Sequence, residues 1–154
     1  ASAHLEMGYV EEAQEWVDRA FAMRNNIPEA HMVAGRIARL QGDPDTALVH
    51  FELVTSLSQY DPRPWIERSE MALSAGDHQA ARNYAHQATD VAGADPRVFL
   101  AQARILIALD ALDDALASCE AALMRDPKRE ETLQLHAHIW DLMVKANEPA
   151  GKDD

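Results

Sequence analysis

The sequence predicts an all-α protein: a right-handed α-solenoid of antiparallel helix pairs that ends in a C-terminal capping helix. Two observations predict this fold. Small residues recur every 34 residues in one register, and within each interval the apolar residues follow the three- and four-residue spacing of a helix face. The composition agrees, because an apolar fraction of 47% and an aromatic fraction of 6% suit closely packed helices better than sheets.

The 34-residue interval appears at several independent positions. Gly8, Gly42 and Gly76 are separated by 34 residues, and the next step falls on Asp110. The other positions that keep the interval are Ala13, Ala47, Ala81 and Ala115; Val17, Phe51, Ala85 and Cys119; Ala20, Val54, Ala88 and Ala122; and Pro28, Pro62 and Pro96. Such an interval predicts repeated helical hairpins, which gain stability by stacking on their neighbours.

Each unit carries helix start and stop signals in a fixed order. A proline opens the first helix, where its missing N–H leaves no hydrogen bond unmade. Gly42-Asp43 and Gly76-Asp77 end one helix and begin the next, since glycine adopts the left-handed conformation and aspartate caps an N-terminus. The predicted helices are a stub over 2–7 and full helices over 10–24, 28–41, 44–58, 62–75, 77–92, 96–109, 112–125 and 128–146.

These helices define the predicted organisation of the chain. The solenoid spans 1–146, with a partial first repeat (1–27), repeats over 28–61, 62–95 and 96–127, and a capping helix (128–146), and a flexible tail follows over 147–154. We expect the capping helix to present Leu133, Ala137, Trp140 and Val144 on its apolar side and Arg129, Gln134, Asp141 and Lys145 on the other. The chain begins inside a unit and without Met, so we expect a fragment of a longer protein, with its localisation open.

This pattern resembles the tetratricopeptide repeat over about residues 1–146. The residues that carry the resemblance are Trp65, Arg68, Ser69 and Ala72, then Phe99, Gln102, Ala103 and Leu106, in the first helices, with Ala34-Gly35 and Ala47-x3-Phe51. His31 and Arg68 depart from the family pattern, which has an aromatic residue and Leu there. The resemblance implies a scaffold that binds a peptide or protein segment and is not an enzyme.

In the family, the first helices line a concave surface where peptides bind. The residues of these helices that we expect to face this groove are Met32, Arg36, Arg39, Ile66, Glu70, Leu73, Arg97, Leu100, Arg104 and His138. Arginine pairs with carboxylates and also lies flat on apolar surface, so the set favours a peptide with apolar anchors and acidic groups. The alternative is that these arginines form ion pairs with Glu29, Glu67 and Glu70.

The best-known carboxylate-binding groove of the family uses Lys and Asn. Around those places this chain has Met32, Arg36, Glu67, Glu70 and Ala101. We therefore do not expect a receptor of that type for chaperone C-termini.

The net charge of -12 argues against nucleic acid or anionic lipid as a partner. Most acidic residues fall in turns and first turns of helices, where they offset the helix dipole. Other functions stay open: an assembly or polysaccharide-export module that contacts a cationic polymer or self-associates through an exposed first-repeat face, or the regulatory array of a larger protein. No apolar run is long enough to predict membrane insertion.

Metal and catalytic chemistry are not predicted. His136 and His138 lie two residues apart on a helix and face different sides, while His31, His50, His78 and His86 form no ligand pair by spacing. Cys119 shares its position with Phe51 and is expected to be buried. No phosphate-binding loop or calcium loop occurs, so no metal and no cofactor is expected.

Overall fold

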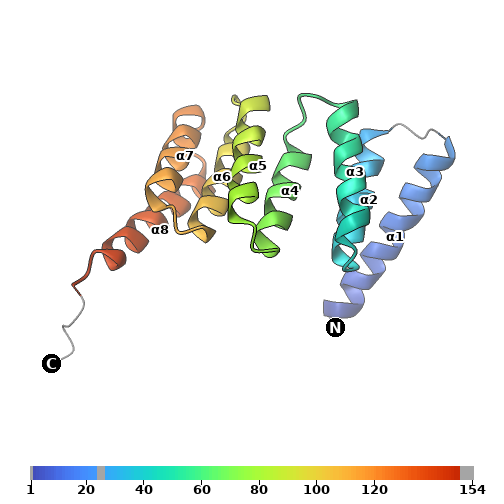
Figure 1. Ribbon diagram of the computed structural model, residues 1–154, viewed down its shortest axis with the longest axis horizontal. Coiled ribbons are helices and arrows are strands. Elements are labelled where there is room, and N and C mark those ends of the chain that lie inside the picture. Colours follow the sequence, from blue (N-terminus) through green and yellow to red (C-terminus); the bar gives the residue numbers. More distant parts are fainter. Residues whose placement is uncertain (1, 24–26, 150–154) are drawn as a thin grey trace.

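The computed structural model describes residues 2–23 and 27–149, and over these residues it contains eight α-helices in antiparallel pairs (Figure 1). The helices are α1 (Ser2–Met23), α2 (Pro28–Leu40), α3 (Pro44–Leu57), α4 (Arg63–Ser74), α5 (His78–Val91), α6 (Pro96–Ala108), α7 (Leu112–Arg125) and α8 (Glu130–Ala146). They stand in one row with α1 and α8 at opposite ends (Figure 1). The predicted all-α stack of helix pairs is confirmed.

Three complete pairs form the body of the row. The pairs are α2 with α3, α4 with α5, and α6 with α7, and each second helix also packs on the first helix of the next pair. The first helices α4 and α6 touch one another directly. The helix α1 packs on α2 in the way that α3 packs on α4, and α8 packs on α7, so α1 stands in the place of a second helix and α8 in the place of a first helix.

The tight turns follow the predicted chemistry. Gly42 and Gly76 have φ values of 78° and 79°, and Asp110, at the same position of the next unit, has a φ of 58°. All three are left-handed, which favours glycine and tolerates aspartate. The side chains of Asp43 and Asp77 accept hydrogen bonds from the backbone N–H groups of Thr46 and Ala80, at 3.1 Å each, and so cap α3 and α5.

The recurring small residues are the contact points within the pairs. Ala47, Ala81 and Ala115 are fully buried. Gly35 on α2 lies against the ring of Phe51 on α3, so closely that a Cβ at position 35 would stand 2.5 Å from Cε1 of that ring. Small side chains therefore set how closely the two helices of a pair approach, because interiors are packed without spare volume.

The first helix differs from the prediction. A stub over 2–7 and a break near Gly8 were expected, but α1 runs without interruption from Ser2 to Met23. The turns at Gly42 and Gly76 are each followed by a capping aspartate, whereas Gly8 is followed by Tyr9, which cannot cap a new helix. The predicted end of this helix at residue 24 lies outside the described residues.

The other predicted helices are present, with ends shifted by at most two residues. The largest shift is in α8, which begins at Glu130, and α4 begins at Arg63 with Pro62 as its N-cap residue. Residues 147–149 are not helical, and the rest of the predicted tail, 150–154, lies outside the described residues. None of the helices over the described ranges is long and apolar enough to cross a membrane.

The capping helix also differs from the prediction. Its packed residues are Thr132 and Ile139, which are fully buried, with Leu135 and Met143 partly buried against the core of the last pair. The apolar side that was expected to close the stack is exposed instead, with Leu133 and Trp140 each 48% exposed. The physical reason is the place of α8 in the row, because these side chains lie where the other first helices contact their own second helix.

Candidate functional site

One exposed position recurs on all four first-type helices. It is held by Arg36 on α2, Glu70 on α4, Arg104 on α6 and His138 on α8, which are separated by 34 residues and which we call the polar stripe. The side chains of Arg36 and Glu70 are 50% and 44% exposed, and Arg104 and His138 are exposed as well. Because equivalent positions of stacked repeats face the same way, these side chains form one line along the row.

Partly buried apolar side chains accompany the polar stripe. Leu73 on α4 packs against the core between α5 and α6, and Ile107 on α6 packs against the core of the last pair. Ile66, near the start of α4, is also half-buried. The predicted site residues Ile66 and Leu73, and Ile107 beside them on the same type of helix, each keep part of their surface free for an apolar contact.

Two of the predicted groove residues are wrong. Met32 is fully buried among Ala38, Phe51 and Val54, and Leu100 is 2% exposed. A first helix inside a row is covered by its own second helix and by helices on both sides, so its free strip is narrower than that of a helix on a simple surface. Met32 and Leu100 fall outside this strip and stabilise the fold.

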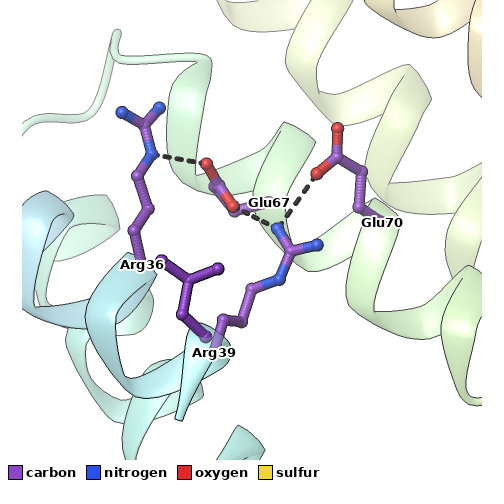
Figure 2. Close-up of a pocket in the computed structure, with 5 residues that line it drawn as sticks. Arg36, Arg39, Glu67 and Glu70 are labelled. Carbon is purple, nitrogen blue, oxygen red and sulfur yellow. Dashed lines mark hydrogen bonds and ion pairs between the residues drawn. The ribbon is translucent and has the colours of Figure 1, made fainter. Parts of the chain in front are cut away.

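The arginines of α2 make ion pairs across the boundary between two pairs of helices. Arg36 Nε donates to Glu67 Oε1 at 2.6 Å, and Arg39 Nη1 donates to Glu67 Oε2 and, at 3.0 Å, to Glu70 Oε2 (Figure 2). These four residues, with Leu40, line an open cavity of about 370 Å³. The ion-pair alternative is therefore confirmed for Glu67 and Glu70, and the cluster joins α2 to α4.

Arg36 and Arg39 differ in which of their guanidinium nitrogens stay free to bind a partner. Burial acts to lower the pKa of Arg39, but hydrogen bonds from its guanidinium to Glu70 and Glu67 outweigh burial and raise the pKa above its ordinary value. The carboxylates thus hold Arg39 as a charged, occupied group. Arg36 uses only Nε, and its two terminal nitrogens point away from Glu67 (Figure 2).

The other predicted arginines lie on α6. Arg97 is exposed, but Asp95, the N-cap residue of α6, accepts hydrogen bonds from its backbone N–H at 2.9 Å and its Nη2 at 3.0 Å. The side-chain hydrogen bond from Arg97 is the main reason why the pKa of Asp95 is lowered. Arg104 makes no hydrogen bond or ion pair within the part of the chain that the structure describes. Glu29 pairs with Arg63 at 2.8 Å, not with the arginines of the predicted groove.

Sequence reasoning missed two contacts inside the pairs. His31 and His50 approach to 3.0 Å between their Nδ1 atoms. The guanidinium carbon of Arg68 lies against both Trp65 and Tyr84, 4.9 and 4.5 Å from their ring centroids. The sequence held the information needed to predict these contacts. Residues 31 and 50, like residues 65 and 84, lie 19 apart, and this spacing places them opposite each other across a pair of helices.

These features define a helical-repeat protein with an exposed stripe of mixed charge along its first helices. The sequence matches the family model of the tetratricopeptide repeat over residues 1–62 and 69–130. The chain belongs to this family, whose members are commonly protein- or peptide-binding modules and typically non-catalytic. No curated protein is similar enough to the chain to count as a relative.

Solved structures show the same fold. A thermophilic tetratricopeptide-repeat protein of Thermus thermophilus, TTC0263, has a TM-score of 0.72 at 20% identity, covering 91% of this chain and 76% of that one. The first such domain of Spaghetti (RPAP3), bound to the HSP90 peptide SRMEEVD, has a TM-score of 0.64 at 16% identity, covering 76% and 95%. YrrB, described as having an unusual peptide-binding site, has a TM-score of 0.60 at 15% identity, covering 95% and 75%.

Proposed function

We propose that this chain is a protein-interaction module that binds a peptide segment of a partner along the polar stripe. The observation that carries the proposal is Arg104, an exposed cation without an ion pair among the described residues, in a chain of net charge -12. Surface arginines in so acidic a chain readily find carboxylate neighbours, as Arg36, Arg39 and Arg63 do. An arginine left open on the stripe is available to a partner's carboxylate.

The chemistry around the polar stripe favours a peptide with both acidic and apolar side chains. Arg104 and the outward nitrogens of Arg36 offer donors that match a carboxylate in bidentate geometry. Ile107, three residues after Arg104 on α6, and Leu73, three residues after Glu70 on α4, offer partly exposed apolar surface near the polar stripe. The acidic peptide SRMEEVD seen with the Spaghetti domain and the peptide-binding site named for YrrB support binding of a peptide as the mode of action.

Not every position on the stripe favours an acidic ligand. Glu70 separates Arg36 from Arg104, and Glu67 neutralises the inner side of the cavity between α2 and α4. We therefore expect a carboxylate of the partner at Arg104 and a less acidic segment beside Glu70. This alternation should distinguish the chain from relatives with a uniformly basic groove.

The test is selection of peptides from a randomised display library against the folded chain. Peptides that bind should be enriched in Asp or Glu together with Leu, Ile, Val or Phe. For the best selected peptide, Arg104→Glu should weaken binding about tenfold or more, because a charged hydrogen bond worth roughly 1.5–3 kcal/mol is lost and a repulsion takes its place.

The matched control is Lys128→Glu, which makes the same change of charge on the exposed loop between α7 and α8. It should leave binding nearly unchanged. Arg104 is a cleaner probe than Arg36, since Arg36→Glu would also place a second carboxylate beside Glu67. Equal binding by Arg104→Glu and the original chain would show that the polar stripe is not the binding surface.

A further inference from the structure

The outer side of α3 carries three large apolar side chains that stay partly exposed. Val49, Leu53 and Leu57 are 57%, 41% and 40% exposed. They follow one another at a spacing of four residues, so they lie in one line along the helix, which we call the apolar stripe. At 1.5 Å per residue, the apolar stripe is about 12 Å long, or roughly two turns of helix. Helix α3 packs on α2 and α4, and the apolar stripe lies on the side that both leave open.

The other units show that the fold does not require these side chains. By the 34-residue interval, the residues equivalent to Val49 are Glu15, Asn83 and Ala117, and those equivalent to Leu53 are Arg19, Gln87 and Ala121. They are polar, charged or small, yet α1, α5 and α7 take the same place in the row as α3 (Figure 1). Val49 and Leu53 therefore add apolar surface that the packing of a second helix does not use. A continuous apolar row with a polar rim is typical of an interaction site.

Carboxylates line the apolar stripe on α3 itself. Asp45 precedes Val49 by four residues and Glu52 follows it by three, so both are its neighbours on the helix surface, and both are exposed. Helix α3 contains no Lys or Arg. Glu52 lies 3.9 Å from Arg68 on α4, and its side chain is 56% exposed. At that distance and exposure, the carboxylate of Glu52 stays accessible to a second cation.

Helix α1 adds negative charge beside the apolar stripe. The ring of Phe21 on α1 lies 6.2 Å from the ring of His50, which precedes Leu53 by three residues, so α1 contacts α3 directly. The sequence of α1 holds five carboxylates and one arginine, and that arginine, Arg19, already pairs with Glu15 at 3.7 Å. The apolar stripe thus lies in a strongly acidic part of the surface.

An α-helix is the occupant that fits such a surface. The side chains of Val49, Leu53 and Leu57 have no hydrogen-bonding atoms, so an extended peptide laid along them would leave its backbone N–H and C=O groups without partners there. A helix pairs its own backbone groups and presents apolar residues at spacings of three and four, which pack into a row of the same spacing. The surrounding carboxylates favour Lys and Arg next to those apolar residues.

We infer that the apolar stripe of α3 binds an amphipathic helix of a partner protein, whose apolar face is flanked by Lys or Arg. The apolar residues of this helix pack on Val49, Leu53 and Leu57, while its basic side chains reach Asp45, Glu52 and the carboxylates of α1. Two other occupants suit the surface less well. A second copy of the chain carries the same carboxylates on its own apolar stripe, and these carboxylates also repel an anionic membrane surface.

The apolar stripe is separate from the polar stripe. The polar stripe runs along the first helices α2, α4, α6 and α8, whereas the apolar stripe lies on the second helix α3. The two surfaces also select opposite charges, since Arg104 favours an acidic peptide and the rim of the apolar stripe favours a basic helix. The two proposals can therefore fail or succeed independently.

The test is selection from a display library of helical peptides, in which Leu is fixed at spacings of three and four and the flanking positions are randomised. Peptides that bind a chain with both Val49→Asn and Leu53→Gln are removed first. These substitutions copy the side-chain types of α5 at the equivalent positions, so the helical content measured by circular dichroism should not change. Peptides that then bind the unaltered chain should be enriched in Lys and Arg at the flanking positions.

Affinities of the best peptide test the single contacts. Leu53→Gln should weaken binding about tenfold or more, because a leucine side chain no longer loses its contact with water on binding. Glu52→Gln should weaken binding several-fold at low salt and less at high salt, since screening already reduces the attraction between exposed charges. The matched control is Met124→Gln on α7, which removes another apolar side chain, 82% exposed, and should leave binding unchanged.

The inference fails if no peptide remains after the removal step, or if the remaining peptides show no preference for Lys and Arg. It also fails if another occupant claims the apolar stripe. Sedimentation equilibrium would reveal a dimer of the unaltered chain that Leu53→Gln abolishes, and flotation with phosphatidylserine vesicles would reveal membrane binding that the same substitution abolishes. Neither is expected.

Discussion

Gly35 shows that the absence of a single side-chain carbon controls how closely two helices approach. Its position on α2 leaves 2.5 Å between an added Cβ and the Phe51 ring on α3. We predict that Gly35→Ala lowers the free energy of unfolding by about 1–3 kcal/mol, because the ring or the helix must shift in a packed interior. Urea unfolding followed by circular dichroism measures this change.

The chain supplies a matched control for that substitution. Gly8 lies inside α1, and an added Cβ there would meet no atom within 4 Å. Gly8→Ala should raise the free energy of unfolding by about 0.5–1 kcal/mol, because alanine favours the helix where no contact opposes it. Similar effects of the two substitutions would contradict the role given to Gly35.

Glu67 is the carboxylate on which the ion-pair cluster between α2 and α4 depends. Its side chain is 11% exposed and accepts hydrogen bonds from both Arg36 and Arg39. We predict that Glu67→Ala lowers the free energy of unfolding by about 1–3 kcal/mol, since a carboxylate shared by two guanidinium groups is removed. Glu70→Ala is the comparison, because Glu70 is 44% exposed and bonded to Arg39 alone, and its loss should matter by only about 0–1 kcal/mol.

At the scale of helices, the sequence predicted the turns better than the ends of the row. Gly42 and Gly76 were recognisable because a capping aspartate follows each of them, and Asp110 took the same left-handed conformation without being glycine. The prediction of a turn at Gly8 was wrong. The 34-residue interval groups Gly8 with Gly42 and Gly76, but Tyr9, which follows it, cannot cap the N-terminus of a new helix. A repeat position predicts a turn only when the next residue can begin a helix.

The candidate site was predictable only in part, for a related reason. The three- and four-residue spacing of a helix assigns about half of its circumference to one face. The predicted groove therefore included Met32 and Leu100 together with Arg36 and Arg104. Inside the row each first helix is covered on several sides, and only the strip that holds Arg36 and Arg104 stays free. Whether an arginine in this strip forms an ion pair depends on side chains of the neighbouring helix. Arg36 on α2, for example, is paired by Glu67 on α4, and the residues of α2 alone do not reveal this pairing.

The meeting point of α1, α2 and α3 should respond to pH. His31 on α2 and His50 on α3 face one another through Nδ1, and the ring of Phe21 on α1 lies 4.9 Å from His31 and 6.2 Å from His50. Burial, and then the neighbouring His31, lower the pKa of His50 from its ordinary value. The unfolded chain therefore binds a proton at a higher pH than the folded chain does.

The sign of the effect follows from that difference. Well above a pH of about 6.5, the ordinary pKa of histidine, His50 is neutral in both the folded and the unfolded chain and lowers stability by nothing. As the pH falls toward and through that value, the unfolded chain gains a proton before the folded chain does, so the free energy of unfolding should fall. His50→Gln should show a smaller fall between pH 7.5 and 5.5 in urea titrations, whereas His78→Gln, at the exposed start of α5, should behave like the unaltered chain.

At the scale of the whole molecule, net charge acts against the folded state. The chain carries a net charge of -12, so its acidic side chains repel one another when the chain is compact. The range of this repulsion depends on salt, because the Debye length falls from about 30 Å at 0.01 M to about 8 Å at 0.15 M. The burial of apolar side chains such as Phe51 and Leu106 has no such dependence at these salt concentrations.

Salt should therefore stabilise the folded chain. We predict that raising NaCl from 0.02 to 0.3 M raises the midpoint of thermal unfolding measured by circular dichroism, since screening weakens the repulsion among the acidic side chains and leaves the apolar core intact. A lower midpoint at high salt would mean that ion pairs such as those of Glu67 contribute more to stability than the net repulsion takes away.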